Sequence, residues 1–304
     1  MSGERQPAAA WMGRQERSNR AILRLMVWIS LHLGRRVGRS LLYVIALYFT
    51  LFSPAARRAG RDYLARVLGR LPTWRDGYRH VLSFASTIHD RVYLLNDRFE
   101  LFDIHIEGAD AVHAALAEGG GALLLGGHLG SFEVMRAIGR GMAGLKVAML
   151  MYEENTRKLN ATLEAINPQA RQDIIALGRI DSMLAVQEKL SQGYLVGILA
   201  DRGLNNEATV SLPFLGEAAP FPSGPFRLAA MLRRPVLFMS GLYLGGNRYR
   251  VHFEPLVDFS RVGSGERQHA MREAQALYVA RLEDHCRQAP YNWFNFFDFW
   301  HPER

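Results

Sequence analysis

The chain of 304 residues contains a single cysteine, no internal repeat and no low-complexity segment. Cys286 alone cannot form an internal disulfide framework or a cysteine-rich zinc or iron–sulfur site. A composition of 49% hydrophobic and 22% charged residues excludes a disordered tail or a fibrous repeat. The length fits one α/β domain or two smaller domains, so length alone leaves the number of domains open.

Apolar runs long enough to span a bilayer are also missing from the N-terminal quarter. Residues 21–33 and 41–52 are its two apolar runs. A helix as long as the second run measures roughly 18 Å, against a hydrocarbon core of about 30 Å, so it is too short to cross alone. No small-residue cleavage site follows the apolar run, and more basic residues come first, which argues against a secretory signal peptide.

Positive charge is concentrated in this same quarter. Residues 1–75 carry 14 arginines and no lysine against three acidic residues, a net charge of +11, whereas the whole chain carries +8. Apolar runs flanked by arginines favour association with an anionic membrane surface. A buried helical hairpin with a solvated basic loop is the alternative. Nucleic-acid binding is not expected, because the basic residues alternate with long aliphatic stretches.

From about residue 100 onward, strand and helix signals alternate. The block 119–127, GGGALLLGG, has the pattern of a strand buried on both faces, and apolar residues at helical spacing follow it. Further strands are predicted at Lys146–Met151, Asp173–Ala176, Leu195–Leu199 and Val236–Leu244. Helices are predicted at Thr156–Ile166, Asp181–Gln192 and Gly224–Arg233, and Gly245-Gly246-Asn247 predicts a hairpin from Pro235–Leu244 to Arg248–Glu254.

This alternation predicts a single α/β domain with a central, mostly parallel sheet flanked by helices. Together with the N-terminal features, it divides the chain into two parts. Residues 1–75 are expected to form basic, hydrophobic helices that associate with a membrane, and residues 76–304 the α/β domain.

The segment from Gly126 to Glu133, GGHLGSFE, places His128 just beyond the carboxyl end of a predicted strand. Ligands of open α/β sheets bind at that edge. Glu133 falls in the first turn of the following helix, near enough to accept a hydrogen bond from the imidazole. Such a pair can deprotonate a hydroxyl that attacks an activated ester. The alternative is a loop histidine that caps a helix, and a zinc site is not expected because further ligands are missing.

Two further segments carry polar residues at predicted strand and helix ends. Asp201 and Arg202 follow an apolar strand, where an arginine could clamp a phosphate or carboxylate or form a loop salt bridge. Ser223 and Gly224 open a helix that contains Arg227 one turn inside. Backbone N–H groups there could bind an anion, and a simple proline-rich turn is the alternative.

Together these segments resemble the bacterial acyltransferases that add secondary acyl chains to lipid A, a branch of the lysophospholipid acyltransferase superfamily. His128 and Glu133 match the family's His-x4-Asp/Glu motif, and 200–203, ADRG, falls where the family carries an acid after a strand. The resemblance runs from about residue 20 to 300. The other matches, in family order, are 212–216 (LPFLG), the Ser223-Gly224 turn with 227–229 (RLA), and 234–236 (RPV).

The resemblance implies transfer of an acyl chain from an acyl carrier protein thioester, or acyl-CoA, to a hydroxyl of a lipid A-like or other glycolipid, with no metal and no organic cofactor. It also implies a peripheral or monotopic protein on the cytoplasmic face of the bacterial inner membrane. The implied general base is His128, with Glu133 as its orienting partner. The implied substrate-binding residues are Asp201, Arg202, Ser223, Gly224 and Arg227.

Two departures leave the substrate open. Residues 290–300, PYNWFNFFDFW, stand where lipid A enzymes tend to carry a tryptophan followed by histidine and basic residues. The acceptor could therefore be a differently headed lipid, a lipid-linked pigment or an ornithine lipid. The family also tends to have an arginine between the two motifs, for which Arg171 and Arg179 are the candidates.

Two other functions remain as alternatives. The same base could activate water in a lipid ester or thioester hydrolase, and the absence of a G-x-S-x-G motif excludes only the serine version. An inactive lipid-binding scaffold would tolerate replacement of both His128 and Glu133.

Three remaining features favour structural roles. Cys286 follows His285 in a predicted amphipathic helix and is expected to be a buried structural cysteine. The aromatic stretch 291–300 is typical of a core or of a membrane-interface belt. His89-Asp90-Arg91 is expected to be a solvated or capping cluster on a helix.

Overall fold

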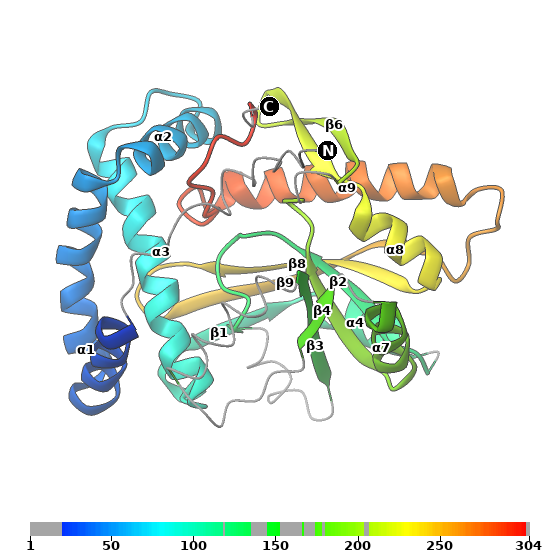
Figure 1. Ribbon diagram of the computed structural model, residues 1–304, viewed down its shortest axis with the longest axis horizontal. Coiled ribbons are helices and arrows are strands. Elements are labelled where there is room, and N and C mark those ends of the chain that lie inside the picture. The colour runs from blue at the N-terminus through cyan, green and yellow to red at the C-terminus, as the bar shows by residue number, and fades with distance from the viewer. Residues whose placement is uncertain are drawn as a thin grey trace, which may run out of the picture.

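A seven-stranded sheet organises the α/β part of the chain (Figure 1). The computed structural model describes residues 20–117, 119–134, 145–152, 166, 174–177, 180–203 and 207–301. The strands are β1 (Asp103–Glu107), β2 (Ala122–Gly126), β3 (Lys146–Tyr152), β4 (Ile174–Leu177), β5 (Tyr194–Leu199), β8 (Pro235–Tyr243) and β9 (Arg248–Asp258). Their order is β1-β9-β8-β2-β5-β3-β4, and of these pairs only β8–β9 is antiparallel.

Strand β2 lies at the centre of the sheet, and all five of its residues are buried. Leu123 and Leu125 join an apolar cluster on one face that also contains Tyr278 of helix α9 (Arg267–Gln288). Leu124 joins the cluster on the other face with Val112 of α4 (Ala109–Leu116). Burying each leucine stabilises the fold by about 1.5–3 kcal/mol. The strand is continuously apolar because both of its faces are covered.

Helices α7 (Ile180–Ser191) and α8 (Gly224–Leu232) contribute to the same apolar cluster as α9. The strands β6 (Thr209–Phe214) and β7 (Glu217–Pro222) form a separate antiparallel hairpin. A short 3-10 helix, η1 (Phe99–Leu101), precedes β1.

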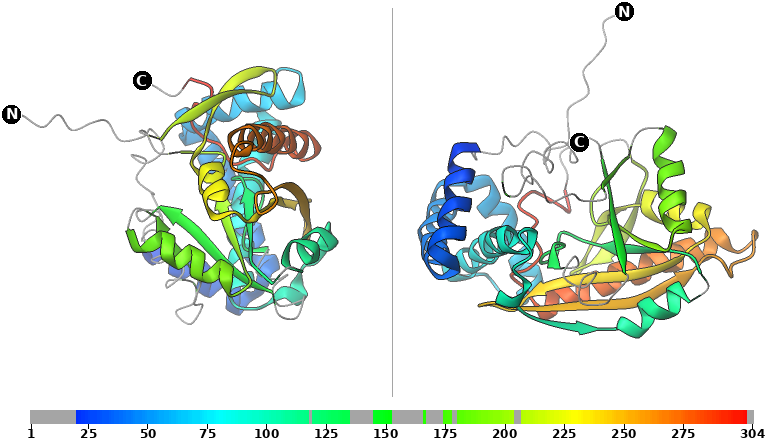
Figure 2. Two further views of the ribbon diagram at one scale, coloured as in Figure 1. Left: turned by 90° about the vertical axis from the view of Figure 1, so that its right-hand side faces the viewer. Right: turned by 90° about the horizontal axis from the view of Figure 1, so that it is seen from below.

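Three N-terminal helices stand beside the sheet: α1 (Arg20–Phe52), α2 (Pro54–Leu68) and α3 (Trp74–Leu95) (Figures 1 and 2). Gly34 breaks the helical geometry of α1 with a φ of +84°, so the two apolar runs of the sequence lie on either side of a kink. Within the described residues, no helix by itself has both the length and the apolar character of a membrane span. The pair Leu25–Phe52 and Pro54–Leu68, bent by 95°, meets that test together.

The predicted fold class is confirmed, and so are most of the predicted elements. The predicted hairpin is β8–β9, where Gly245 and Gly246 adopt the positive φ values that the turn requires. The predicted helices at 181–192 and 224–233 are α7 and α8. Most of the helix predicted at Thr156–Ile166, and both candidate arginines Arg171 and Arg179, lie outside the described residues.

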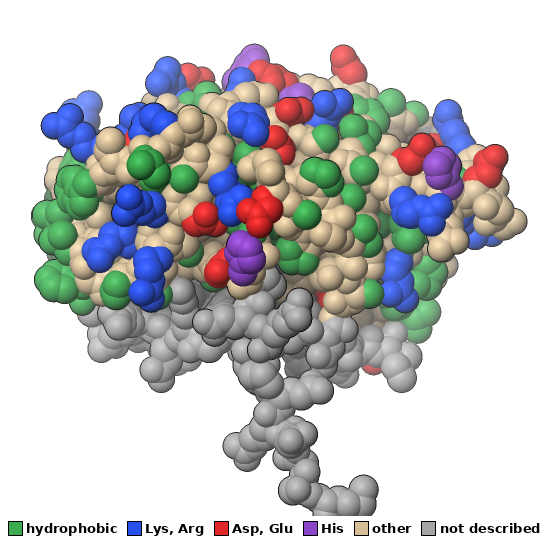
Figure 3. Space-filling view, turned by 90° about the horizontal axis from the view of Figure 1, so that it is seen from above, with side chains coloured by type: hydrophobic (Ala, Val, Ile, Leu, Met, Phe, Trp, Pro, Cys, Tyr) green, Lys and Arg blue, Asp and Glu red, His purple; other side chains and the backbone are tan. Residues whose placement is uncertain are grey.

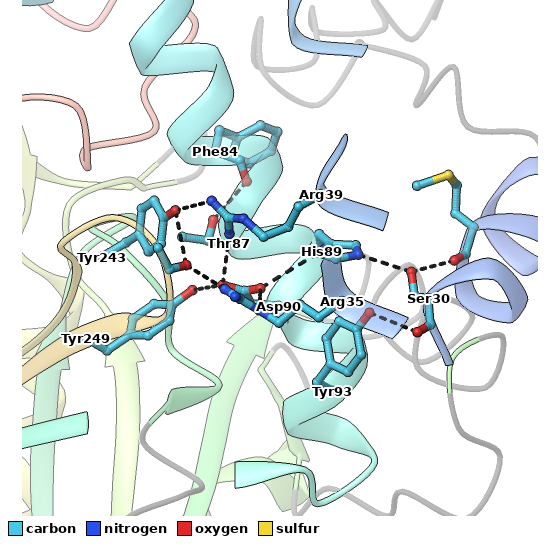
Figure 4. A network of polar contacts seen from close by, with 12 residues as sticks. Ser30, Arg35, Arg39, Phe84, Thr87, His89, Asp90, Tyr93, Tyr243 and Tyr249 are labelled. Atoms are coloured by element: carbon cyan, nitrogen blue, oxygen red, sulfur yellow. Dashed lines mark hydrogen bonds and ion pairs between the residues drawn. The ribbon is translucent and has the colours of Figure 1, made fainter. Parts of the chain in front are cut away.

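The cluster His89-Asp90-Arg91 differs from the prediction, because it is packed between elements instead of being solvated. Asp90 is fully buried, and the Nε and Nη2 atoms of Arg35 on α1 each donate to it at 2.9 Å (Figure 4). The Tyr249 hydroxyl on β9 donates to the same carboxylate at 2.8 Å. Asp90 can be buried because the arginine and tyrosine donors replace its water.

Two structural predictions for the C-terminal part are confirmed. Cys286 is fully buried in α9, and burial raises the pKa of its thiol. In the aromatic stretch 291–300, the side chains of Trp293, Phe294, Phe299 and Trp300 are buried, so the core alternative holds for them.

Candidate active site

His128 and Asp201 meet because their strands are parallel neighbours in register. Gly126, the last residue of β2, pairs with Leu199, the last residue of β5. His128 and Asp201 each follow two residues later, at the carboxyl edge of the sheet. Seventy-three residues of sequence separate them, yet the strand pairing brings them into contact.

Two hydrogen bonds join His128 and Asp201 into a dyad. The imidazole Nδ1 of His128 lies 2.9 Å from Oδ1 of Asp201, and the backbone N–H of His128 donates to Oδ2 at 3.0 Å. The Asp201 side chain is fully buried, whereas the His128 side chain is 35% exposed. A carboxylate beside Nδ1 favours the imidazole tautomer that is protonated on Nδ1, which leaves Nε2 as the basic nitrogen.

Burial and the neighbouring charges favour the neutral form of His128 and the ionised form of Asp201. Burial, with the positive charge of Arg202, lowers the pKa of His128 below its ordinary value, and Asp201 offsets this only in part. Burial acts to raise the pKa of Asp201, but the hydrogen bonds from His128 and the charge of Arg202 outweigh it. The pKa of Asp201 therefore falls well below its usual range. A neutral imidazole beside an ionised carboxylate is the state that a general base requires.

Arg202 lies next to the dyad and is held by the C-terminal segment. Its Nη2 donates to the carbonyl of Phe294 at 2.7 Å, and its guanidinium lies 4.9 Å from the ring centre of Phe297. Its Nε is 3.9 Å from Asp201 Oδ2. The arrangement keeps a positive charge close to His128 without a direct bond to the imidazole.

Glu133 does not contact the imidazole, contrary to the expected hydrogen bond. Its carboxylate is buried and lies 2.7 Å from Nε of Arg91 on α3, with the Ser131 hydroxyl at 3.4 Å. The acid across the strand pairing reaches Nδ1 instead of the acid five residues along the chain. The ion pair with Arg91 ties the residues after His128 to α3.

Ser223, Gly224 and Arg227 lie at the start of α8, beyond the Asp201–Gly203 loop. The Ser223 hydroxyl donates to the carbonyl of Ala208 at 2.9 Å, and Arg227 is exposed. A Cβ built at Gly224 would collide with the carboxylate of Glu207, and one built at Gly203 would lie 2.7 Å from the same carboxylate. The second and third predicted segments are therefore adjacent, joined through Glu207.

Sequence reasoning gave structural roles to the segments that contain Trp293 and Arg91 and did not place either residue in the site. The indole Nε1 of Trp293 donates to Oδ2 of Asp201 at 3.0 Å, and its ring is fully buried. Both residues reach the site through contacts distant in sequence, so spacing along the chain gave no sign of them. Within the described ranges, no group of three or more His, Cys, Asp or Glu side chains is placed to hold a metal ion.

A partly exposed imidazole backed by a buried carboxylate, at the carboxyl edge of a mostly parallel sheet, is an arrangement that can perform general-base chemistry in an α/β enzyme. Residues 22–301 match the family model of the bacterial lipid A biosynthesis acyltransferases. The chain belongs to this family and is an acyltransferase that acts on lipid. No curated protein gives a match to the chain.

Proposed function

We propose that the protein transfers a fatty acyl chain from a thioester of acyl carrier protein or CoA to a hydroxyl of a lipid A-like or other glycolipid. The observation that carries this proposal is the His128–Asp201 dyad, in which a partly exposed imidazole has its Nδ1 on a buried carboxylate. Nε2 then faces the substrates as the base.

The reaction would proceed by direct attack. Nε2 of His128 takes the proton of the acceptor hydroxyl as its oxygen bonds to the thioester carbonyl carbon. The C–S bond of the tetrahedral intermediate then breaks, and the imidazolium returns the proton to the leaving thiolate. Asp201 stabilises the imidazolium between these steps, and the charge of Arg202 would favour the oxyanion. No covalent acyl-enzyme is required.

The remaining predicted residues take supporting roles in this proposal. Glu133, through its ion pair with Arg91, would hold the segment after His128 in place. Ser223 and Gly224 would line the part of the site next to Arg202, and the exposed Arg227 would bind an anionic group of a substrate.

We further propose that residues 1–75 place this site at the cytoplasmic face of the bacterial inner membrane. The inward face of α1 packs Leu42, Ala46 and Thr50, whereas its outward face exposes large apolar side chains. The most exposed of them between residues 41 and 52 are Tyr43, Val44, Tyr48, Leu51 and Phe52. Figure 3 shows hydrophobic side chains at the edge where α1 lies, with Lys and Arg side chains beside them. An apolar outward face beside arginines suits an anionic bilayer.

Flotation with phosphatidylglycerol vesicles tests the membrane part. We expect Val44→Asp with Phe52→Asp to leave most of the chain unbound, because two carboxylates would enter the apolar surface. Leu184→Asp changes an equally exposed leucine on α7 and is the matched control, expected to float like the wild type. Equal binding by all variants would contradict the assignment of α1.

Mass spectrometry of total lipids tests the reaction. Strains would carry no gene, the wild-type gene, His128→Ala, or His105→Ala, which alters an exposed histidine on β1 as a control. We expect a lipid heavier by one acyl chain with the wild type and His105→Ala only. Free fatty acid as the main product of the purified protein, unaffected by added acceptor lipid, would instead indicate a hydrolase.

A further inference from the structure

The C-terminal segment 291–300 passes the carboxyl edge of the sheet and is bonded to the main chain of His128 and Gly130. The backbone N–H of Gly130 donates to the carbonyl of Asn292 at 2.9 Å, and that of Phe294 donates to the carbonyl of His128 at 2.8 Å. The side chain of Asn292 accepts from the N–H of Tyr243 on β8 at 2.7 Å and donates to its carbonyl at 3.0 Å. The segment is thus fixed, main chain to main chain, on the loop that carries the base.

Trp293 sits between these bonds and reaches the carboxylate of Asp201. Its indole N–H and the backbone N–H of His128 both donate to Oδ2, each at 3.0 Å. Two donors on Oδ2 leave Oδ1 to the imidazole Nδ1, at 2.9 Å. A carboxylate held by three donors from different directions cannot rotate without breaking at least one bond.

The indole is itself held in one orientation by rings from distant elements. Tyr63 of α2, Phe214 of β6 and Phe299 pack edge-on against it, with ring centres 5.0, 5.2 and 4.9 Å away. His80 of α3 contacts the carbonyl of Trp293 through Nε2 at 2.8 Å. The direction of the indole N–H is therefore set by the N-terminal helices and the β6–β7 hairpin together.

We propose that Trp293 is a positioning residue for acyl transfer, whose indole N–H holds Asp201 so that its Oδ1 stays on Nδ1 of His128. This inference rests on the proposed function in that His128 is the base. It goes further by making the C-terminal segment, fixed against α2 and α3, part of what keeps the dyad aligned. The N-terminal helices thereby act on the site through a tryptophan that never touches the substrate.

The indole N–H has a second, electrostatic consequence. A donor on Oδ2 withdraws part of the negative charge that stabilises the imidazolium. Among the described residues, the other titratable groups near the dyad are Arg202, from the same loop as Asp201, and Tyr278 and Cys286 of α9. The Tyr278 hydroxyl donates to the Gly126 carbonyl at 2.8 Å. Without the indole N–H, the carboxylate of Asp201 would therefore be less ordered, and more of its negative charge would act on His128.

Trp293→Phe in the full-length protein, in detergent micelles, is the test. We expect kcat to fall about tenfold, as for the loss of a hydrogen bond to a charged group, while KM for the thioester is unchanged. The pKa of His128, followed by NMR of labelled histidine and assigned with His128→Ala, should rise. A rate that falls while the base becomes more basic is a signature that simple loosening of the core would not give.

Trp300→Phe is the matched control, because it removes a second buried indole of the same aromatic cluster. Its N–H donates to the Phe214 carbonyl at 3.3 Å and not to Asp201. We expect Trp300→Phe to leave the pKa of His128 unchanged. An equal pKa in wild type and Trp293→Phe, or the same shift in both variants, would overturn the proposal.

Should Trp293→Phe fail to fold, benzothienylalanine introduced at position 293 replaces the indole N–H by sulfur and keeps the ring shape. The expected rise in pKa and the overturning result are the same. The NMR titration needs no substrate, so it separates this inference from the proposed reaction. If lipid acylation fails to depend on His128 but the titration shifts, the contact is established and the proposed function is wrong.

Discussion

Two buried aspartates of this protein have opposite partners. Asp90, between α1, α3 and β9, binds Arg35 in a bidentate pair, with Arg39 at 3.8 Å and the Tyr249 hydroxyl at 2.8 Å. Asp201, at the carboxyl edge of the sheet, binds the imidazole of His128 and the neutral indole of Trp293. Both side chains are fully buried.

The difference lies in whether the main ionic partner of each aspartate, Arg35 or His128, can change its charge. Arg35 holds Asp90 in the bidentate pair and stays protonated at any physiological pH, so this pair joins α1 to the α/β domain, with Nδ1 of His89 farther away at 3.7 Å. Histidine can gain and lose a proton, so the partner of Asp201 can take up a proton during a reaction, which Arg35 cannot do beside Asp90. Burial of a carboxylate therefore says little about its role until its partners are known. We assign Asp90 to stability and propose Asp201 for the chemistry.

The largest effect expected from this comparison is loss of activity in Asp201→Asn. The amide removes the negative charge and cannot favour the Nδ1–H tautomer, so acyl transfer should fall by about 10³-fold or more. Single-turnover transfer from the thioester to acceptor lipid measures this. A loss of less than tenfold in the folded protein would remove Asp201 from the proposed mechanism.

Asp90→Asn should instead lower the stability of the protein and leave its activity nearly unchanged. It leaves Arg35 and Arg39 without a carboxylate, and breaking a buried ion pair lowers the free energy of unfolding by about 3–5 kcal/mol. The rate per folded molecule should stay close to the wild-type rate. Thermal unfolding in detergent and a rate normalised to folded protein test both statements.

Glu217→Gln is the control for Asp90→Asn, because it removes a half-exposed partner of Arg66. It should change the free energy of unfolding far less than Asp90→Asn does, because solvent screens an exposed ion pair. If Asp90→Asn abolished transfer in protein that remains folded, the division of roles between the two aspartates would be wrong.

His80 is a third kind of buried group, a histidine whose partner is a backbone carbonyl. It should make the free energy of unfolding decrease in acid. Burial lowers the pKa of His80 from its ordinary value of 6.5 to about 4, although its bond to the Trp293 carbonyl opposes this. Between pH 6.5 and about 4 the unfolded chain binds a proton that the folded chain does not. Stability should therefore decrease as the pH falls through this window and, for this group, stay constant above it.

The contribution of His80 would be about 1.4 kcal/mol for each pH unit below 6.5. Denaturant titrations at several pH values measure the slope. His285, whose pKa burial and the nearby His252 and Arg250 also lower to about 4, adds to the same slope. His80→Gln should therefore reduce the slope without removing it. An unchanged slope would show that His80 titrates normally.

The smallest expected effect is a shift of the pH profile in Arg202→Gln. The charge of Arg202 lowers the pKa of His128, so its removal should raise that pKa. The acid limb of kcat/KM would then move to higher pH, because the base must lose its proton before it can act. Arg227→Gln, which alters the exposed arginine of α8, is the control and should leave the limb in place.

Much of the fold could be predicted from the sequence, because its elements have local signals. The glycine-bounded apolar run of β2 and the turn at Gly245 and Gly246 each specify their own geometry. The same reasoning placed His128 and Asp201 at the carboxyl ends of strands. The neighbouring positions of β2 and β5 in the sheet could not be read from spacing.

The partners of the site residues could not be predicted for the same reason. Glu133 was expected on the imidazole because it falls in the first turn of the predicted helix after His128, but Arg91 of α3 holds it. Asp90 was expected in a solvated or capping cluster, because the sequence pattern does not show that its arginine partners on α1, 51 and 55 residues away, would pack against it. Local patterns specify elements, whereas strand order and helix packing decide which charges meet.

The most direct test of the central claim is an NMR titration of the His128 imidazole in Asp201→Asn and in Glu133→Gln. Asp201 raises the pKa of His128 through its charge and hydrogen bond, so Asp201→Asn should lower that pKa further below its ordinary value. Glu133→Gln should leave it unchanged, because Arg91 and not His128 binds that carboxylate. A pKa that shifts in Glu133→Gln and stays constant in Asp201→Asn would contradict the account.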